Sequence, residues 1–164
     1  DGLAVQYLIT LAVGVFGGIC GAYLYHASFN DSPTPRTELQ VLSTPAQDAL
    51  QLPFAEGVQI GDVIVLSGQI GAKPGTLKLV PGGIQAETRQ TLENIKASLE
   101  RYGSSMERVF KCTVFIRDMA DWPAMNEVYV EMFDGHRPAR SAVGSSGLAL
   151  EGNVEIECFA LAGR

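Results

Sequence analysis

Two groups of polar residues in the last quarter of the chain have the types and spacing for chemistry on a small acid. Arg140 lies where a strand is predicted to begin, within the segment Arg137–Ser141. Arginine binds a carboxylate through two parallel hydrogen bonds. Glu155 and Glu157 alternate along a later strand and share one of its faces, where a glutamate can hold a water or move a proton. The alternative is a structural ion pair for Arg140 and two solvated glutamates.

Common catalytic templates are missing from the sequence. Residues 71–76 lack the Gly-Lys-Ser/Thr end of a Walker A loop, and residues 144–147 do not form a G-x-S-x-G nucleophile elbow. His26 and His136 have no cysteine or carboxylate at ligand spacing, so no metal site is expected. A net charge of -6 with scattered lysines and arginines gives no basic surface, and no nucleic-acid partner is expected.

The three cysteines have no spacing typical of a metal or redox motif. Cys20 lies in a hydrophobic segment, while Cys112 and Cys158 lie in apolar runs that resemble strands. We therefore interpret all three as small buried residues, and we do not predict a disulfide framework.

The hydrophobic pattern predicts the elements that position Arg140 and Glu155. Residues 61–62 read as a tight turn between two strands, and apolar residues spaced by three and four predict two helices. Asp121 is expected to cap the second helix, with Pro123 in its first turn. The predicted strands are 57–60, 63–67, a short one between loops 74–75 and 81–83, 109–116, 140–145 and 154–161; the first helix covers about 84–102.

This order predicts an α+β domain in which a mixed sheet carries both helices on one face. In the last strand, Val154, Ile156, Cys158 and Ala160 face one way, and the two glutamates face the other way. Apolar residues are abundant enough in the strands to need cover on both faces. Oligomerisation is the simple way to cover the second face.

The segment from Leu3 to Tyr25 contains no charged side chain. As a helix it would be about 35 Å long, enough to cross a bilayer core of about 30 Å. We predict a single-pass membrane protein, with a cleaved signal peptide and a buried soluble helix as the alternatives. Glycines recurring every fourth residue favour close packing with another copy or with foreign transmembrane helices. Neither the membrane nor the orientation follows from the flanking charges.

Three parts of the chain are predicted. Residues 1–27 contain the transmembrane helix and its flanks, residues 28–50 form an extended proline-containing linker, and residues 51–164 form the folded domain. Part of the linker, residues 38–42, has the composition of an edge strand.

Four motifs, in order and at matching spacing, resemble the RidA/YjgF family from about residue 53 to residue 162. They are Val65–Ile70 with its Ser-Gly-Gln, Gln85–Ile95, Thr113–Met119, and Arg137–Ser141 followed by Val154–Glu157. The resemblance implies a chorismate-mutase-like fold and a homotrimer whose sheets form a central barrel. It also implies cofactor-free clefts between subunits that hydrolyse 2-imino or enamine acids to 2-keto acids and ammonia, as a 2-iminobutanoate/2-iminopropanoate deaminase does.

The resemblance also assigns roles by position. Arg140 would clamp the substrate carboxylate, Glu155 would position or activate water, Asn126 would line the cleft and Gly68 would offer a main-chain contact. Two positions depart from well-studied members. Phe54 replaces a cleft tyrosine and Ala142 replaces a cysteine, and both changes make the pocket more apolar.

These departures, with the membrane segment, keep a second function open: a non-catalytic accessory subunit of a larger membrane complex. A ribonuclease is disfavoured by the acidic charge balance.

Overall fold

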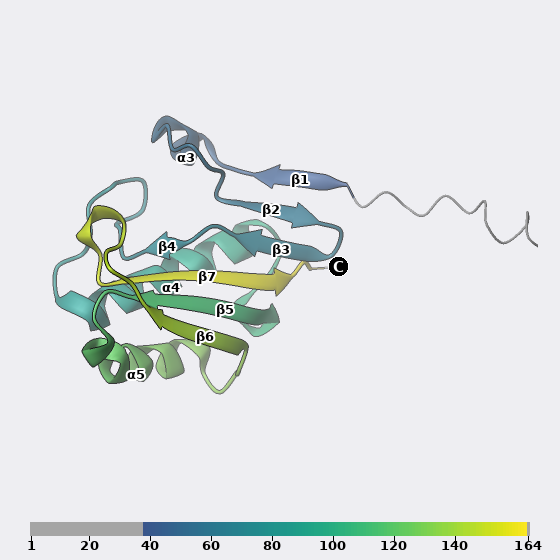
Figure 1. Ribbon diagram of the computed structural model, residues 1–164. Helices are drawn as coiled ribbons and strands as arrows, with labels where there is room; N and C mark the ends of the chain where they lie inside the picture. The colour runs from purple at the N-terminus through teal and green to yellow at the C-terminus, as the bar shows by residue number, and fades with distance from the viewer. Residues whose placement is uncertain (1–37, 164) are drawn as a thin grey trace, which may run out of the picture. The chain divides into compact units, whose positions relative to one another are not determined.

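The computed structural model describes residues 38–163, which fold as a seven-stranded sheet with two long helices (Figure 1). The elements in chain order are β1 (Leu39–Leu42), α3 (Pro45–Ala49), β2 (Gly57–Ile60), β3 (Val63–Leu66), β4 (Gln69–Ile70), α4 (Gly83–Arg101), η1 (Met106–Arg108), β5 (Val109–Ile116), η2 (Met119–Asp121), α5 (Trp122–Phe133), β6 (Ala139–Gly144), η3 (Ala149–Glu151) and β7 (Val154–Leu161).

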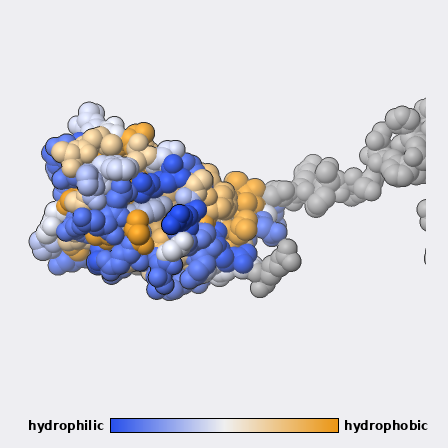
Figure 2. Space-filling model, turned by 90° about the horizontal axis from the view of Figure 1, so that it is seen from below, coloured by the Kyte–Doolittle hydropathy of each residue, from blue (hydrophilic) through white to orange (hydrophobic). Residues whose placement is uncertain are grey.

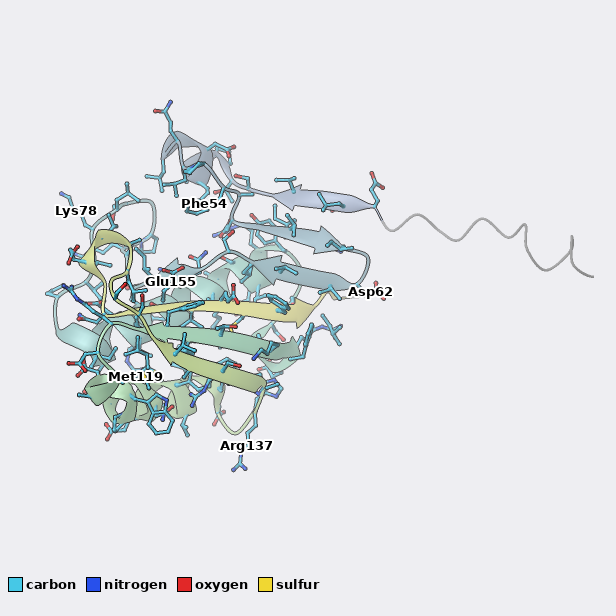
Figure 3. The ribbon with its side chains drawn as sticks, viewed as in Figure 1. Phe54, Asp62, Lys78, Met119, Arg137 and Glu155 are labelled. Atoms are coloured by element: carbon cyan, nitrogen blue, oxygen red, sulfur yellow. A yellow bond between two sulfur atoms is a disulfide. The ribbon has the colours of Figure 1, made fainter. Side chains whose placement is uncertain are left out.

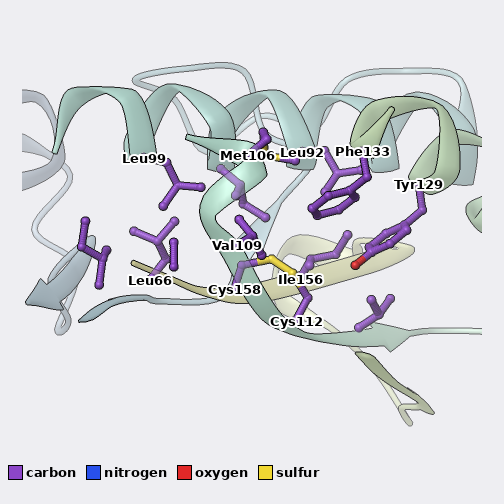
Figure 4. Packing of buried hydrophobic residues seen from close by; sticks show 14 of the residues in the cluster. Leu66, Leu92, Leu99, Met106, Val109, Cys112, Tyr129, Phe133, Ile156 and Cys158 are labelled. Atoms are coloured by element: carbon purple, nitrogen blue, oxygen red, sulfur yellow. A yellow bond between two sulfur atoms is a disulfide. The ribbon is translucent and has the colours of Figure 1, made fainter. Parts of the chain in front are cut away.

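The sheet is mixed, with the strand order β1-β2-β3-β7-β5-β6, and β4 also pairs with β7. Strands β5 and β6 are parallel because α5 carries the chain back between them, and the other pairs are antiparallel. Figures 1 and 4 show α4 and α5 on the same side of the sheet. The α+β class with two helices on one face is therefore confirmed.

The core lies between the sheet and the two helices. Alternate residues of β7 (Val154, Ile156, Cys158 and Ala160) are fully buried, as the alternation in the sequence predicts. They meet Leu92, Ile95 and Leu99, which recur at helical spacing along α4 (Figure 4).

Local signals in the sequence predict most element boundaries. The turn at 61–62 joins β2 to β3 in a hairpin. Helix α4 ends where Gly103 takes a positive φ of 74°, which glycine adopts without steric cost. Pro123 lies in the first turn of α5, as predicted, but the Asp121 side chain makes no capping hydrogen bond. Asp118 instead accepts from the Ala120 amide and caps η2.

The edge strand expected within the predicted linker is present, and a short helix follows it. Residues 39–42 form the edge strand β1, which pairs with β2, and residues 45–49 form the short helix α3. Thr44 caps α3 by accepting from the Gln47 amide, and Pro45 fits the first turn because its missing N–H is not needed there. Residues 38–50 therefore belong to the same compact unit as the rest of the domain.

The short strand predicted between residues 75 and 81 is also wrong. That loop forms a single bridge between Ala72 and Leu79, because Pro74 and Gly75 turn the chain too tightly for a longer ladder.

The interpretation of Cys112 and Cys158 as free buried thiols is wrong. They form a disulfide, visible as the yellow bond in Figure 4, and both residues are fully buried. The physical reason is the sheet register, since Cys112 on β5 lies directly opposite Cys158 on β7 and both side chains point into the core. The sequence separation of 46 residues hides this pairing from local inspection. Cys20 lies outside the described residues.

The predicted membrane span, residues 3–25, also lies outside the described residues. Within 38–163, no helix combines the length and apolar character needed to cross a bilayer. On the face shown in Figure 2, polar residues predominate and apolar residues form separate patches.

Candidate active site

Glu155 lies on the face of β7 opposite the helices, beside β4. It pairs with Ile70 of β4, and its carboxylate lies against the backbone of Gly68. A side chain at Gly68 would collide with the Glu155 carboxyl oxygen and displace the carboxyl group from its present position. Gly68 and Glu155, which the sequence singled out separately, therefore form one unit.

The environment of Glu155 favours its protonated form. Burial raises the pKa of the Glu155 carboxyl above its ordinary value, and the negative charge of Glu157 raises that pKa further. Among residues 38–163, neither a hydrogen bond nor a cation stabilises the carboxylate. A half-buried carboxyl group with a raised pKa is suited to accepting a proton during a reaction.

Glu155 and Gly68 line a cavity of about 490 Å³. Its walls come from α3, from the segment before β2, from the loop after β4, from α4 and from η3. Phe54 lines it too, and Figure 3 shows Phe54 and Glu155 at the same end of the sheet. The cavity therefore gathers three of the predicted site residues.

A buried carboxylate fixes the segment that carries Phe54. Glu56 accepts hydrogen bonds from Ser98 Oγ at 2.5 Å, Tyr102 Oη at 2.6 Å and Arg101 Nη1 at 2.7 Å, all on or next to α4. Burial alone would raise the pKa of Glu56, but these three donors together lower it. Burial and the neighbouring Glu56 charge raise the pKa of Tyr102 to about 12. Glu56 is therefore a structural anchor.

A second carboxylate fixes the start of β7. The buried Glu87 accepts from both the backbone amide and the side-chain amide of Asn153, at 2.7 and 2.5 Å. Asn94, about two turns later on α4, donates to the carbonyls of Ile70 and Ala72. These bonds hold β4 and β7 on α4, and so they fix the position of Glu155.

Arg140 lies in a different environment. It stands beside Cys112 in the sheet and on the helix-facing side, where Nη1 donates to Asn126 Oδ1 at 2.7 Å. The guanidinium carbon lies 4.6 Å from the Tyr129 ring centroid and 5.9 Å from that of Trp122. Among the described residues, Arg140 has no carboxylate partner. A guanidinium held by neutral groups keeps its charge available for an anion.

The aromatic ring beneath Arg140 is itself buried. Burial raises the pKa of Tyr129 to about 12, although the Arg140 charge opposes the rise. The Tyr129 hydroxyl has no hydrogen-bond partner among the described residues. Ala142, the next residue of β6 on the same face, is partly buried and packs on the core.

One chain therefore forms two separate groups of predicted site residues. Phe54, Gly68 and Glu155 line the cavity, whereas Arg140, Asn126 and Ala142 lie on the opposite face of the sheet and outside the cavity lining. Arg137, three residues before Arg140, is exposed and points away from the domain (Figure 3).

Sequence reasoning named Asn126 but missed Trp122 and Tyr129. These three residues are spaced by four and three along α5, so helical periodicity alone places them on one face beneath Arg140. The leucines that line the cavity come from distant segments, and no local pattern joins them. Among the described residues, no cluster of histidine, cysteine or carboxylate side chains can hold a metal ion.

Comparison with known proteins finds relatives along most of the folded domain. The profile of the family described as Endoribonuclease L-PSP matches residues 46–162. A 2-iminobutanoate/2-iminopropanoate deaminase from the mite Dermatophagoides farinae is 41% identical over 118 residues, covering 72% of this chain and 92% of the mite protein.

Two solved structures are also similar. Yeast Mmf1 superposes with a TM-score of 0.68 at 30% identity, covering 76% of this chain and 99% of Mmf1. Escherichia coli TdcF, solved with bound serine, has a TM-score of 0.64 at 37% identity, covering 68% and 90% of the two chains. Because the profile spans more than half of the sequence, this chain belongs to the RidA/YjgF family, the Endoribonuclease L-PSP family of that profile.

Proposed function

We propose that the protein hydrolyses 2-imino acids, and their enamine tautomers, to 2-keto acids and ammonia in a homotrimer. Each site takes Arg140 from one copy and Glu155 from its neighbour. The observation that carries the proposal is the position of these two groups on opposite faces of one sheet. Among residues 38–163, Arg140 has no carboxylate partner and the Glu155 carboxyl has no cation beside it. Neither group by itself can both bind the carboxylate of a small acid and activate a water molecule.

Two relatives support this reaction class. The mite protein is named a deaminase of 2-iminobutanoate and 2-iminopropanoate, which are small 2-imino acids. TdcF was solved with serine, which is a small acid carrying a carboxylate and a nitrogen on adjacent carbons. The family description names a ribonuclease, but a net charge of -6 is unfavourable for binding a polyanion.

In the proposed mechanism, Arg140 binds the substrate carboxylate. Asn126 occupies one Nη1 hydrogen, and the other guanidinium hydrogens stay free for the carboxylate oxygens. The Tyr129 ring below keeps the guanidinium in place. This clamp fixes C2 of the imino acid relative to the carboxyl group of the neighbouring copy.

Glu155 then acts on water. Its ionised carboxylate takes a proton from the water as the oxygen attacks C2, and passes that proton to the imine nitrogen to give a tetrahedral carbinolamine. Glu155 then takes the hydroxyl proton of the carbinolamine and passes it to the amino nitrogen as the C–N bond breaks. The water oxygen becomes the keto oxygen, ammonia leaves with both water protons, and Glu155 is ionised again.

The open face of the sheet favours assembly. It carries large apolar side chains that the helices do not cover, among them Ile60, Val143 and Leu161 at 41, 44 and 44% exposure. Packing three such faces together would remove these side chains from water.

Native mass spectrometry of the protein tests the assembly. We expect a particle of three chains. Each site needs residues from two neighbouring copies, and in a closed ring every copy has a neighbour on each side. A stable monomer with full activity would contradict the shared site.

The reaction is tested by generating an imino acid with an amino-acid oxidase and trapping it with semicarbazide. The protein is expected to reduce the trapped imine and to release keto acid in its place. A trapping yield unchanged by the protein would reject the reaction. The spontaneous hydrolysis rate, measured without protein, is the baseline.

We further propose that residues 3–25 anchor the trimer in a membrane. The support is their uninterrupted apolar composition. After alkaline carbonate treatment of cell membranes, the full chain should stay in the pellet, and a variant without residues 1–27 should move to the supernatant. Release of the full chain by carbonate would contradict the anchor.

A further inference from the structure

The cavity wall beyond Glu155 is largely apolar. Gly68 and Glu155 lie at one part of the lining, where the reaction would occur. Polar side chains such as Gln47, Lys73 and Arg101 are also present. Large apolar side chains from four separate segments line much of the rest: Leu50, Leu52, Phe54, Ile70, Leu77 and Leu150. Its volume of about 490 Å³ lies in the range typical of small-molecule sites.

Three of these side chains are unusually exposed for their type. Phe54 is 52% exposed, Leu77 is 47% exposed and Leu150 is 45% exposed. Each could have been polar without loss to the core, because none belongs to the buried cluster. Their convergence on one cavity, from segments far apart in sequence, indicates a surface for an apolar ligand group.

The backbone of η3 places Leu150 at the cavity against its conformational preference. Leu150 and Glu151 both have positive φ, at 56° and 59°, which is uncommon for residues with a Cβ. Arg117 holds the turn by donating to the Glu151 carbonyl at 2.9 Å and to its carboxylate at 2.8 Å. A strained conformation maintained by side-chain hydrogen bonds is typical of a binding site.

We propose that the preferred substrates are 2-imino acids with a bulky aliphatic or aromatic side chain, and that Leu150 helps to select them. This inference rests on the proposed function and names its substrate class. With the carboxylate on Arg140 and C2 at Glu155, the substrate side chain extends along the leucine-lined wall. Water adds across the C=N bond and ammonia leaves, so the balance is imino acid plus water to keto acid plus ammonia.

The size of the expected preference follows from burial. Each methylene placed in an apolar pocket changes kcat/KM by about 10-fold or more. A one-carbon side chain leaves the leucine wall in contact with water, while a four-carbon branched side chain covers it. We therefore expect kcat/KM for the leucine-derived imino acid to exceed that for the alanine-derived one by at least about 10-fold.

The experiment compares these two imino acids, both generated in the assay from their amino acids by an oxidase. Leu150→Ala should lower kcat/KM for the leucine-derived substrate by about 10-fold and change that for the alanine-derived substrate less than about 2-fold. Val130→Ala is the matched control, since Val130 is 67% exposed on α5 and outside the cavity. It should leave both values unchanged.

The outcomes separate the two proposals. Equal wild-type rates on both substrates, or an equal loss on both in Leu150→Ala, would overturn the substrate class and leave the deaminase function standing. Hydrolysis of neither substrate above the spontaneous rate would overturn the deaminase function, and the substrate class with it. Calorimetry with the keto-acid products gives a second readout: 4-methyl-2-oxopentanoate should bind more tightly than pyruvate, and weaker binding would count against the proposal.

Discussion

Replacing Arg140 with alanine is expected to lower kcat/KM for imino-acid hydrolysis by about 100-fold. The variant loses two charge-assisted hydrogen bonds to the substrate carboxylate, and each factor of ten corresponds to about 1.4 kcal/mol. Arg140→Lys should recover part of the loss, because lysine keeps the charge but not the forked geometry. Steady-state kinetics with the semicarbazide trap measures both.

Arg137→Ala is the matched control for this prediction. Arg137 has the same charge, lies three residues earlier and points into solvent, so its loss should change kcat/KM less than about 2-fold. If Arg137→Ala and Arg140→Ala were equally impaired, the effect would reflect net charge instead of a carboxylate clamp. Circular dichroism checks that Arg140→Ala keeps its fold after losing the contact with Tyr129.

Replacing Glu155 with glutamine is expected to lower kcat by about 100-fold or more, since a positioned general base contributes that much. The pH profile gives a sharper test. Hydrolysis needs the ionised carboxylate, so the wild-type rate should fall as pH decreases through the raised pKa of Glu155. Glu155→Gln should lose this acidic limb.

Glu157→Gln provides the control within the same strand. Glu157 is the second cause of the raised pKa, so removing its charge should move the acidic limb to lower pH while the plateau rate stays nearly unchanged. An unmoved limb would show that another group titrates.

The Glu155→Gln variant should be less active but more stable than the wild type. Because the folded-state pKa of Glu155 is raised, ionisation of this carboxyl lowers the stability of the fold as pH rises. Glu155→Gln should therefore unfold at a higher temperature near neutral pH.

Co-expression of the two inactive chains, Arg140→Ala and Glu155→Gln, tests whether the site is shared. In a randomly mixed trimer, a site is intact when the chain that supplies Arg140 is the Glu155→Gln chain and the chain that supplies Glu155 is the Arg140→Ala chain. This combination gives about a quarter of wild-type activity. A site formed within one chain would recover none. This experiment distinguishes a shared site from two independent losses.

The sequence predicted the fold well where local patterns determine it. The alternation of buried residues along β7 and the helical spacing of Leu92, Ile95 and Leu99 are properties of single elements. The structure shows both patterns. The errors concern contacts between distant segments. The Cys112–Cys158 bond depends on the register of β5 against β7. The prolines in residues 28–50 predict extended chain, although Pro45 begins a helix.

The candidate site was predictable residue by residue but not as an arrangement. Arg140 and Glu155 could be named from residue type, position and family resemblance. Their separation on two faces of the sheet follows only when the register of β5, β6 and β7 is known. The apolar wall of the cavity depends on the strained turn at Leu150, and no sequence pattern predicts a leucine with positive φ.

The disulfide connects the strands behind both halves of the site, since β5 supports Arg140 through β6 and β7 carries Glu155. Closing a loop of this length removes conformational freedom from the unfolded chain, and in the loop-entropy account this is worth about 4 kcal/mol. That share of the stability exists only while the bond is oxidised. Because both cysteines are fully buried, a reductant reaches the bond only after the fold opens. The oxidised protein therefore resists reducing surroundings kinetically, and a chain that unfolds among reductants returns to a less stable native state.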